Sequence, residues 1–315
     1  MIVTSTPLRI SLFGGSTDNP RFIEKYGAGS VISFACNLKT YVILSQDKLG
    51  ANQFNHRYVI NYSVREEVDN IAEIKNEIVR YVFEHFNIKP VQVTLTSDVY
   101  SQGSGLASSS SYLISLIKAV VIFKGIHMTD SEICALAFDI ETHFNPHCGY
   151  QDPYGCGVGG FKKIDFTKEG VKYQFLGTDL FKEYDMNLVF TGITRNSKVV
   201  LSSVTENIEK TQALLPLVDK AQQSLFNKDY KTFINLFNES WQIKKKTSPM
   251  ITGNDIISSM DNELSNNKSV LAHKLCGAGA GGFYLTLSKK DSLDISYNSI
   301  KINVNEEGVI GHEFS

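Results

Sequence analysis

One short segment restricts the possible folds and functions of this chain more than any other. Residues 101–111 read Ser-Gln-Gly-Ser-Gly-Leu-Ala-Ser-Ser-Ser-Ser, and the strongly apolar stretch Tyr112–Lys124 follows directly. Glycines let a backbone approach a ligand closely, and the first amides of a helix have no partner within the helix, so a loop at this position favours an anion. Serine hydroxyls add donors for phosphate oxygens and a ligand for Mg²⁺. The segment predicts a phosphate-binding loop, and the plainer alternative is a helix that begins with a serine cap.

Two common nucleotide-binding motifs can be excluded for this chain. A Walker-type loop ends in Gly-Lys followed by Ser or Thr, which no glycine in the chain provides. The glycines of residues 277–282 fit the G-x-G-x-x-G pattern of dinucleotide-binding folds, but that pattern must open a helix. Residues 283–287 instead alternate between large apolar and polar or smaller side chains, which predicts a strand. A glycine loop between two strands is the better interpretation.

The overall composition is that of an ordinary globular protein. Of 315 residues, 42% are hydrophobic and 20% are charged, and the net charge is -2, so nothing indicates disorder or a nucleic-acid-binding surface. The five cysteines are scattered without zinc-type spacing, which indicates reduced thiols, and no apolar run has the length of a membrane span. We therefore expect a cytoplasmic protein without nucleic-acid or membrane partners, and the oligomeric state stays open.

Hydrophobic periodicity predicts an α+β protein of two lobes that divide near residue 180. Strands and helices do not alternate regularly, which argues against a parallel βαβ fold. The expected strands are 8–13, 40–46, 58–62, 91–97, 187–191, 283–288 and 301–304, and the expected helices are 71–86, 112–124, 130–143, 197–226 and 229–245.

Three segments resemble the three motifs of the GHMP kinases, and they occur in the family's order. Gly105–Ser109 resembles the second motif, Gly-Leu-Gly-Ser-Ser, although Ala107 stands where glycine is usual and Gln102 where proline is common. Pro7–Asp18 resembles the first motif in the form used by the sugar-kinase branch. Lys274–Phe283 resembles the third motif.

The resemblance implies a fold, a reaction and its cofactors. The implied fold is the two-lobed GHMP kinase fold, with a ribosomal protein S5 domain 2-like domain over residues 1–180 and a ferredoxin-like domain over residues 181–315. The implied reaction is transfer of a phosphoryl group from ATP to an alcohol, with Mg²⁺. The residues implied to bind the nucleotide are Gly103, Ser104, Gly105, Leu106, Ala107, Ser108, Ser109 and Ser110.

Two acids eleven positions apart are expected to carry the chemistry. Glu141 and Asp152 match the GHMP spacing between a magnesium ligand and a catalytic aspartate. Phosphoryl transfer depends on positioning and charge neutralisation, with a carboxylate that orients or deprotonates the incoming hydroxyl. By resemblance, Ser109 and Glu141 bind Mg²⁺, Asp152 is the general base, and Arg9 stabilises charge on the transferred group.

The acceptor site is expected at the first motif. A carboxylate after a Gly-Gly turn is suited to sugar hydroxyls, because it accepts two hydrogen bonds from a diol. The substrate contacts implied by the resemblance are Gly15, Thr17, Asp18 and Gly279.

Smaller resemblances concern the identity of the acceptor. Thr191–Ser197, and Trp241 with Lys244–Lys246, resemble the branch that phosphorylates D-glycero-D-manno-heptose 7-phosphate at O1. The far phosphate of such a sugar needs a cation, for which Arg195, Lys198 and Lys244–Lys246 are candidates, although a lysine run can equally be a solvated helix face. Two alternatives stay open: a kinase of an unphosphorylated sugar such as fucose or galactose, and a non-catalytic sensor of nucleotide and sugar.

Overall fold

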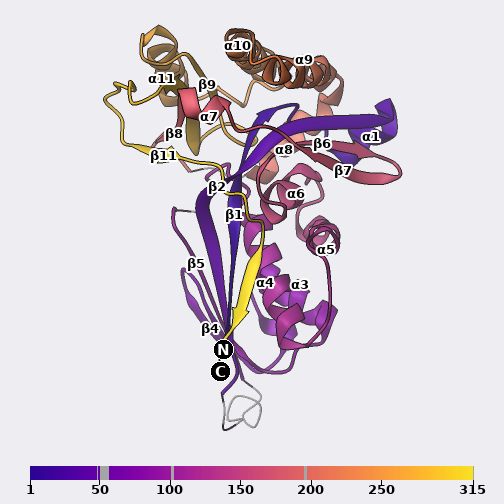
Figure 1. Ribbon diagram of the computed structural model, residues 1–315. Helices are drawn as coiled ribbons and strands as arrows, with labels where there is room; N and C mark the ends of the chain where they lie inside the picture. The colour runs from indigo at the N-terminus through magenta and orange to yellow at the C-terminus, as the bar shows by residue number, and fades with distance from the viewer. Residues whose placement is uncertain (48, 50–56, 101–102, 195–196, 315) are drawn as a thin grey trace.

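The computed structural model describes residues 1–47, 49, 57–100, 103–194 and 197–314, and its larger sheet is mostly antiparallel. The strands of this sheet are β1 (Ile2–Phe13), β2 (Ala28–Ser45), β3 (Tyr58–Asn61), β4 (Arg65–Val68), β5 (Gln92–Ser97), β6 (Phe161–Thr167), β7 (Gly170–Phe175) and β12 (Ile310–Glu313). Their order is β12-β1-β2-β5-β3-β4. Because β2 is long, its first half pairs with β6, which pairs with β7, and its second half pairs with β5. A strand from near residue 310 thus completes the edge beside β1 (Figure 1).

A second, antiparallel sheet forms the other lobe. Its strands are β8 (Tyr184–Phe190), β9 (Ala272–Leu275), β10 (Phe283–Lys289) and β11 (Ser299–Ile302), in the order β11-β8-β10-β9. The strand predicted after the glycine loop is β10, and the loop joins β9 to β10. The α+β class expected from the sequence is therefore confirmed.

Helices cover both sheets. In Figure 1, α3 (Glu77–Phe86), α4 (Ser108–Phe123) and α5 (Asp130–Phe144) lie together on one side of the larger sheet. The short α1 (Pro20–Tyr26) and α6 (Gln151–Gly157) lie near its upper end in this view. The helices of the second lobe are α7 (Leu180–Glu183), α8 (Ser197–Glu206), α9 (Leu215–Phe226), α10 (Tyr230–Thr247) and α11 (Asp255–Asn266).

Three helical predictions need correction. The helix expected over 71–86 is a 3-10 turn, η1 (Ile71–Glu73), followed by α3, because the side chain of Asn76 caps α3 by accepting a hydrogen bond from the Val79 amide. The helix expected over 197–226 is divided into α8, the 3-10 helix η2 (Ile208–Leu214) and α9, which begins with a proline in its first turn. Asp152 lies in the short helix α6, which is absent from the expected elements.

The alternation of side chains along β1 positions part of the site. Leu8, Ile10 and Leu12 are fully buried and belong to a core cluster shared with α9 and α10. Because successive side chains of a strand point to opposite faces, Arg9 and Ser11 face the other way. These two polar side chains therefore lie on the same face of one buried strand.

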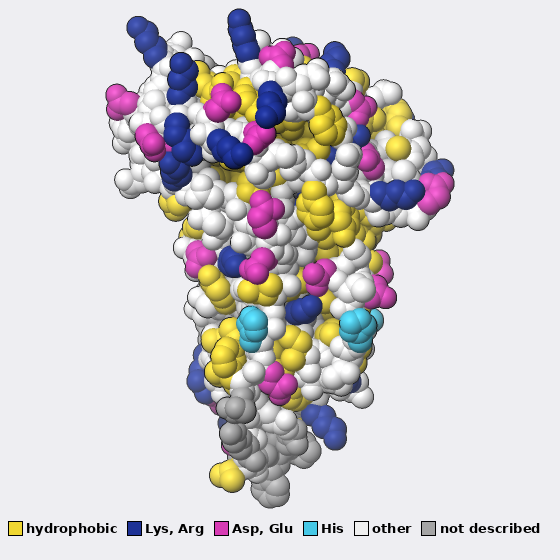
Figure 2. All heavy atoms as spheres, in the orientation of Figure 1, with side chains coloured by type: hydrophobic (Ala, Val, Ile, Leu, Met, Phe, Trp, Pro, Cys, Tyr) yellow, Lys and Arg dark blue, Asp and Glu magenta, His cyan; other side chains and the backbone are white. Residues whose placement is uncertain are grey.

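The side of the surface shown in Figure 2 has no broad basic face among its described residues. On the side shown in Figure 2, Lys and Arg side chains gather over the upper lobe, but Asp and Glu side chains lie among them. Across the described part of the chain, no helix combines the length and the apolar character needed to cross a membrane.

Candidate active site

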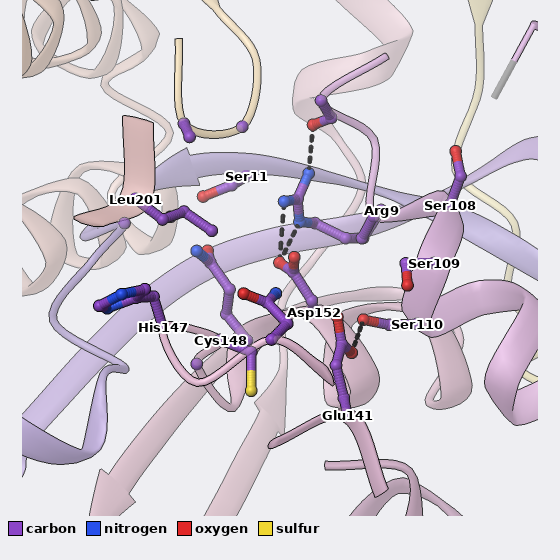
Figure 3. A pocket seen from close by; sticks show the side chains of 18 of the residues that line it. Arg9, Ser11, Ser108, Ser109, Ser110, Glu141, His147, Cys148, Asp152 and Leu201 are labelled. Atoms are coloured by element: carbon purple, nitrogen blue, oxygen red, sulfur yellow. Dashed lines mark hydrogen bonds and ion pairs between the residues drawn. The ribbon is translucent and has the colours of Figure 1, made fainter. Parts of the chain in front are cut away.

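A cavity of about 830 Å³ lies where the two lobes meet. It is lined by β1, by the loop before α4, by α5 and α6, and on the other side by α8, α10 and the loop between β9 and β10. In Figure 3, Ser108, Ser109 and Ser110 lie at one end, His147 and Leu201 lie at the other, and Arg9 and Asp152 lie between them. The cavity can therefore hold two molecules that meet at Asp152.

The predicted phosphate loop forms the end of the cavity at α4. Gly103 and Gly105 have φ of 69° and 80°, and Ala107, the residue before the helix, has φ of 61°. Ala107 thus adopts the left-handed conformation of the glycine usual in this motif, at a cost of about 1 kcal/mol. Ser108, Ser109 and Ser110, at the start of α4, line the cavity, where the first amides of a helix have no partner within the helix, as an anion site requires.

The glycine loop of the third motif packs against the phosphate loop. A side-chain carbon built at Gly282 would lie 2.3 Å from the carbonyl oxygen of Ser104, so no larger residue fits without movement. Gly277 and Ala278 of the same loop line the cavity. The two loops, more than 170 positions apart in the sequence, therefore close one wall together.

The buried Arg9 and the partly exposed Asp152 form an ion pair in the middle of the cavity. Arg9 is 3% exposed, and its Nε and Nη2 both lie 2.8 Å from Oδ1 of Asp152. Its Nη1 donates to the Gly105 carbonyl at 2.7 Å, and its backbone amide donates to the Leu106 carbonyl at 3.2 Å. Arg9 therefore links the phosphate loop to the candidate base. Because both nitrogens contact Oδ1, the other oxygen of Asp152 is left for an acceptor hydroxyl.

The short helix α6 comes unusually close to β1. A side-chain carbon at Gly155 would lie 3.0 Å from Cβ of Arg9 on β1, and one at Gly157 would lie 2.4 Å from Sγ of Cys134 on α5. The glycines of α6 thus allow close packing against both elements, which brings Asp152 to Arg9. At the other end of α6, the fully buried Lys162 donates to the carbonyls of Gly155, Val158, Gly159 and Gly160.

Glu141 is a buried carboxylate beside the serine run. It is 3% exposed and accepts a hydrogen bond of 2.5 Å from Oγ of Ser110 (Figure 3). Its pKa is raised to about 7. Burial is the main cause; the hydrogen bond from Ser110 lowers the pKa, and the nearby charge of Asp152 raises it. Ser109, the serine predicted to accompany Glu141, lines the cavity but is exposed, and the serine bonded to Glu141 is Ser110.

These groups fit a divalent cation. Burial raises the pKa of Glu141, and no salt bridge in the described part of the chain offsets this effect. A carboxylate and a serine hydroxyl are oxygen ligands of the kind that Mg²⁺ takes together with phosphate oxygens. Glu141 with Ser110 and the exposed Ser109 can therefore hold Mg²⁺ beside the phosphate loop.

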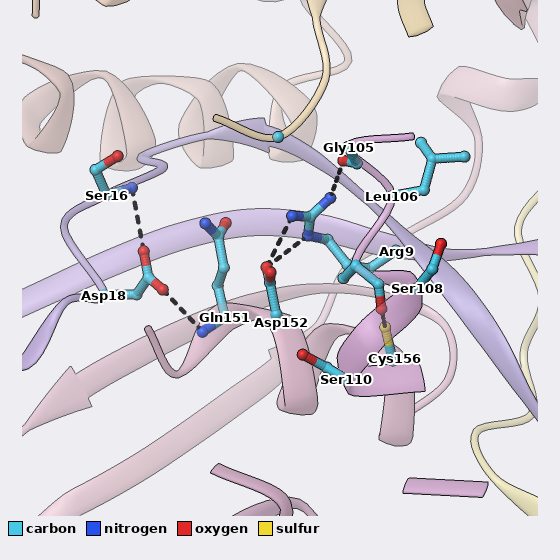
Figure 4. A network of polar contacts seen from close by, with 12 residues as sticks. Arg9, Ser16, Asp18, Gly105, Leu106, Ser108, Ser110, Gln151, Asp152 and Cys156 are labelled. Atoms are coloured by element: carbon cyan, nitrogen blue, oxygen red, sulfur yellow. Dashed lines mark hydrogen bonds and ion pairs between the residues drawn. The ribbon is translucent and has the colours of Figure 1, made fainter. Parts of the chain in front are cut away.

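Asp18 is fixed by two backbone amides at the far side of Asp152 (Figure 4). It is 2% exposed, and its carboxylate accepts hydrogen bonds from the amides of Ser16 at 3.1 Å and Gln151 at 3.0 Å. A side-chain carbon at Gly149 would lie 2.0 Å from Oδ2 of Asp18, so the carboxylate packs directly against the backbone at Gly149. Burial, followed by repulsion from Asp152, raises the pKa of Asp18 to about 6. Asp18 lines the cavity together with Gly15.

Some predicted site residues lie elsewhere. Thr17 is buried, and its hydroxyl donates to the carbonyls of Gly14 and Ser30 instead of lining the cavity. Leu106 packs in the core, so only its backbone serves the loop. Gly279 packs against Ile251, away from the residues that line the cavity.

The basic residues considered for a substrate phosphate have different positions. Arg195 lies outside the described residues, as does the side chain of Lys198. Lys245 forms an ion pair with Asp261 at 2.7 Å in the second lobe, which excludes it from the cavity. Lys244 lines the cavity, where its Nζ donates to the carbonyls of Leu275 and Gly277.

Several cavity residues had no predicted role. Lys274 is 3% exposed, donates to the Leu12 carbonyl at 2.8 Å, and has a pKa lowered by burial to about 8. Ser11 and Gln151 flank Asp152, and side chains of α3 and α8 complete the two ends. Ser11 and Gln151 could have been predicted, because they are close to Arg9 and Asp152 in the sequence. Nothing in the sequence shows which faces of α3 and α8 line the cavity.

Comparison with known proteins finds the same family that the three motifs resemble. Residues 73–160, which hold the phosphate loop, Glu141 and Asp152, match the GHMP kinases N terminal domain. The chain is 28% identical to the D-glycero-alpha-D-manno-heptose 7-phosphate kinase of Campylobacter jejuni, over 98% of this chain and 95% of the relative. The resemblance inferred from the three motifs is thereby confirmed.

Solved structures confirm the fold. A D-glycero-D-manno-heptose 1-phosphate kinase from Bacteroides thetaiotaomicron superposes with a TM-score of 0.78 at 19% identity, covering 100% of both chains. The galactokinase of Lactococcus lactis, solved with galactose, superposes with a TM-score of 0.76 at 15% identity, covering 98% of this chain and 95% of its own.

Proposed function

We propose that this protein, a kinase with a GHMP kinase N-terminal domain, transfers the γ-phosphate of ATP to a sugar phosphate in the presence of Mg²⁺. The proposed acceptor atom is O1 of D-glycero-D-manno-heptose 7-phosphate. The observation that carries the proposal is the common cavity of Glu141, Asp152 and the phosphate loop, because phosphoryl transfer needs a metal site and an acceptor-facing carboxylate at one nucleotide tail. Action in the cytoplasm, inferred from the reduced thiols, belongs to the same proposal.

The chain's own groups suggest how the reaction proceeds. The loop amides and the hydroxyl of Ser108 would bind the phosphates of ATP at the start of α4, and Glu141, Ser110 and Ser109 would hold Mg²⁺. Mg²⁺ would supply charge neutralisation on those phosphates. Asp152 orients the acceptor hydroxyl through its other oxygen and accepts its proton as the new O–P bond forms, while the bond between the γ-phosphorus and the β-phosphate oxygen breaks and ADP leaves.

Arg9 has two effects on this reaction. Its guanidinium holds Asp152 in place, and its positive charge lies beside the phosphate loop, where negative charge builds up during transfer. The pairing orients the Asp152 carboxylate toward the position of the acceptor hydroxyl. Positioning is thus expected to contribute more than the basicity of Asp152.

A sugar phosphate is favoured over a free sugar by two observations. The relative with 28% identity over nearly the whole chain is named for heptose 7-phosphate. Lys244 and Lys274 line the wall of the cavity that α10 and β9 supply, where an acceptor's second anionic group would need cations. A free sugar such as fucose or galactose is the alternative. The Arg9–Asp152 pair argues against a mere sensor, which has no need of an acid aimed at an acceptor.

The test is a panel of sugars and sugar 6- and 7-phosphates with ATP and Mg²⁺, read by ADP release. D-glycero-D-manno-heptose 7-phosphate should give the highest kcat/KM, and Asp152→Asn should lower kcat by about 10²–10⁴-fold while nucleotide binding persists. If a free sugar were turned over faster than the sugar phosphates, the free sugar would be the acceptor and the proposed acceptor would be wrong. ADP release by Asp152→Asn at the wild-type rate would overturn the mechanism.

A further inference from the structure

Several residues that line the cavity carry unsatisfied polar atoms. Seven buried side-chain polar atoms in the described part of the chain have no hydrogen-bond partner. Four of them belong to residues that line the cavity: Ser11 Oγ, Asn145 Oδ1, His147 Nδ1 and Gln151 Oε1. Buried polar groups are nearly always paired, because each unpaired one loses its hydration without compensation. These four atoms therefore indicate a polar ligand.

Ser11 and Gln151, which carry two of these groups, both lie near Gly15 on the cavity wall. A side-chain carbon built at Gly15 would lie 3.6 Å from Ser11 Oγ, 3.9 Å from Gln151 Nε2 and 4.0 Å from Gln151 Oε1. A methyl group at Gly15 would thus be in ordinary van der Waals contact with both side chains. Gly15, Ser11 and Gln151 therefore adjoin one another on the wall of the cavity.

Both side chains are held in place by the elements that carry the Arg9–Asp152 pair. Ser11 is 9% exposed and follows Arg9 by two positions on β1, so both point to the same face. Gln151 opens α6, its amide donates to Asp18, and its side chain lies between Asp18 and Asp152 in Figure 4. The two groups therefore sit next to the position of the reacting hydroxyl.

The chemistry of these groups favours a hydroxyl. Oε1 of Gln151 needs a donor, which an anion cannot supply, and the hydroxyl of Ser11 can donate or accept. A hydroxyl both donates and accepts, so it satisfies Ser11 and either end of the Gln151 carboxamide. Since the reacting hydroxyl occupies Asp152, this second hydroxyl belongs to a neighbouring carbon of the acceptor.

We propose that Ser11 and Gln151 bind the acceptor hydroxyl adjacent to the one that is phosphorylated, and so select a sugar over an alcohol without a vicinal hydroxyl. The inference rests on the proposed function, since it names the specificity determinants of the same acceptor site. For D-glycero-D-manno-heptose 7-phosphate, phosphorylated at O1, the hydroxyl bound by this pair is that on C2.

Three variants test the pair from different sides. Ser11→Ala and Gln151→Leu each remove one partner, and Gly15→Ala puts a methyl group against both side chains without left-handed backbone strain, since Gly15 does not have positive φ. Each should lower kcat/KM for heptose 7-phosphate by about tenfold, the usual effect of a lost buried hydrogen bond, with the KM for ATP unchanged. Ser33→Ala and Ser288→Ala are matched controls, because both hydroxyls are buried and unpaired but lie outside the cavity.

A 2-deoxy analogue of heptose 7-phosphate separates hydroxyl recognition from general damage. The wild type should use the analogue about tenfold less well than the natural sugar, whereas Ser11→Ala and Gln151→Leu should discriminate little between the two. If the wild type uses both sugars equally, or if the variants keep wild-type discrimination, the inference is wrong while the proposed function stands. If the wild type phosphorylates no sugar in the panel, the proposed function fails and the inference fails with it. Should one variant not fold, as judged by urea unfolding, the same outcomes are read from the other two.

Discussion

Replacing Glu141 by glutamine should make the metal-free protein more stable at alkaline pH, although it removes the proposed magnesium ligand. Glu141 is 3% exposed, and burial raises its pKa from 4.5 to about 7. Glutamine has nearly the same shape and keeps an oxygen that accepts the hydrogen bond from Ser110. The substitution therefore removes a buried charge without creating a cavity.

The magnitude follows from the difference between the two pKa values. Between pH 4.5 and about 7 the folded state holds more protons on Glu141 than the unfolded state, so stability is lost as the pH rises through this range. A difference of about 2.5 in pKa, at about 1.36 kcal/mol for each pH unit, amounts to about 3 kcal/mol at pH 8 and about 1 kcal/mol at pH 5. Glutamine does not ionise, so Glu141→Gln should exceed the wild type by these amounts.

Urea unfolding of both proteins with a chelator present, at pH 5 and pH 8, measures the two differences. The advantage of Glu141→Gln should grow by about 2 kcal/mol between these pH values, while its affinity for Mg²⁺ with ATP falls by at least about tenfold. A variant that is less stable than the wild type at pH 8, or an advantage that does not change with pH, would refute the assignment of Glu141 as an uncompensated buried carboxylate.

Three further outcomes are expected. Lys162→Met leaves the carbonyls at the end of α6 without their donor and should lower the free energy of unfolding by about 1–3 kcal/mol; equal urea midpoints for the variant and the wild type would contradict this. Gly282→Ala meets the Ser104 carbonyl and should raise the KM for ATP several-fold, whereas Gly125→Ala, also at positive φ but in open space, should cost only about 1 kcal/mol of stability with no change in that KM. Because the pKa of Lys274 is about 8, the KM for a sugar phosphate should rise as the pH increases through 8, and a profile unaffected by Lys274→Met would remove this residue from substrate binding.

The sequence was informative where local chemistry decides the structure. The serine run after two glycines predicted the start of α4 and its loop, and the alternation after residue 282 predicted a strand where the glycine pattern suggested a helix. The spacing of Glu141 and Asp152 predicted two acids that the structure does bring to one cavity. These features depend on residues close together in the chain, so they can be inferred without tertiary contacts.

Other features of the site depend on packing between distant segments. The glycines of α6 allow the helix to approach β1, and nothing local in the sequence shows that approach. Ser109 and Ser110 are equivalent in the sequence, and only the position of α5 decides that Ser110 meets Glu141. The resemblance implied Thr17 as a substrate contact, yet its hydroxyl donates to the carbonyls of Gly14 and Ser30.

The short helix α6 is fastened at both ends, by the Asp18 carboxylate at Gln151 and by the Lys162 ammonium at its final carbonyls. Because both ends of α6 are held, the position of Asp152 does not depend on the residues that form the rest of the acceptor site. Substitutions on α8 and α10, which form the opposite wall, can reshape the sugar-binding end while Asp152 keeps its orientation. Variants with new acceptor preferences are therefore best sought in those two helices and at Gln151, whereas changes at the end of α6 that Lys162 anchors should impair turnover of every acceptor alike.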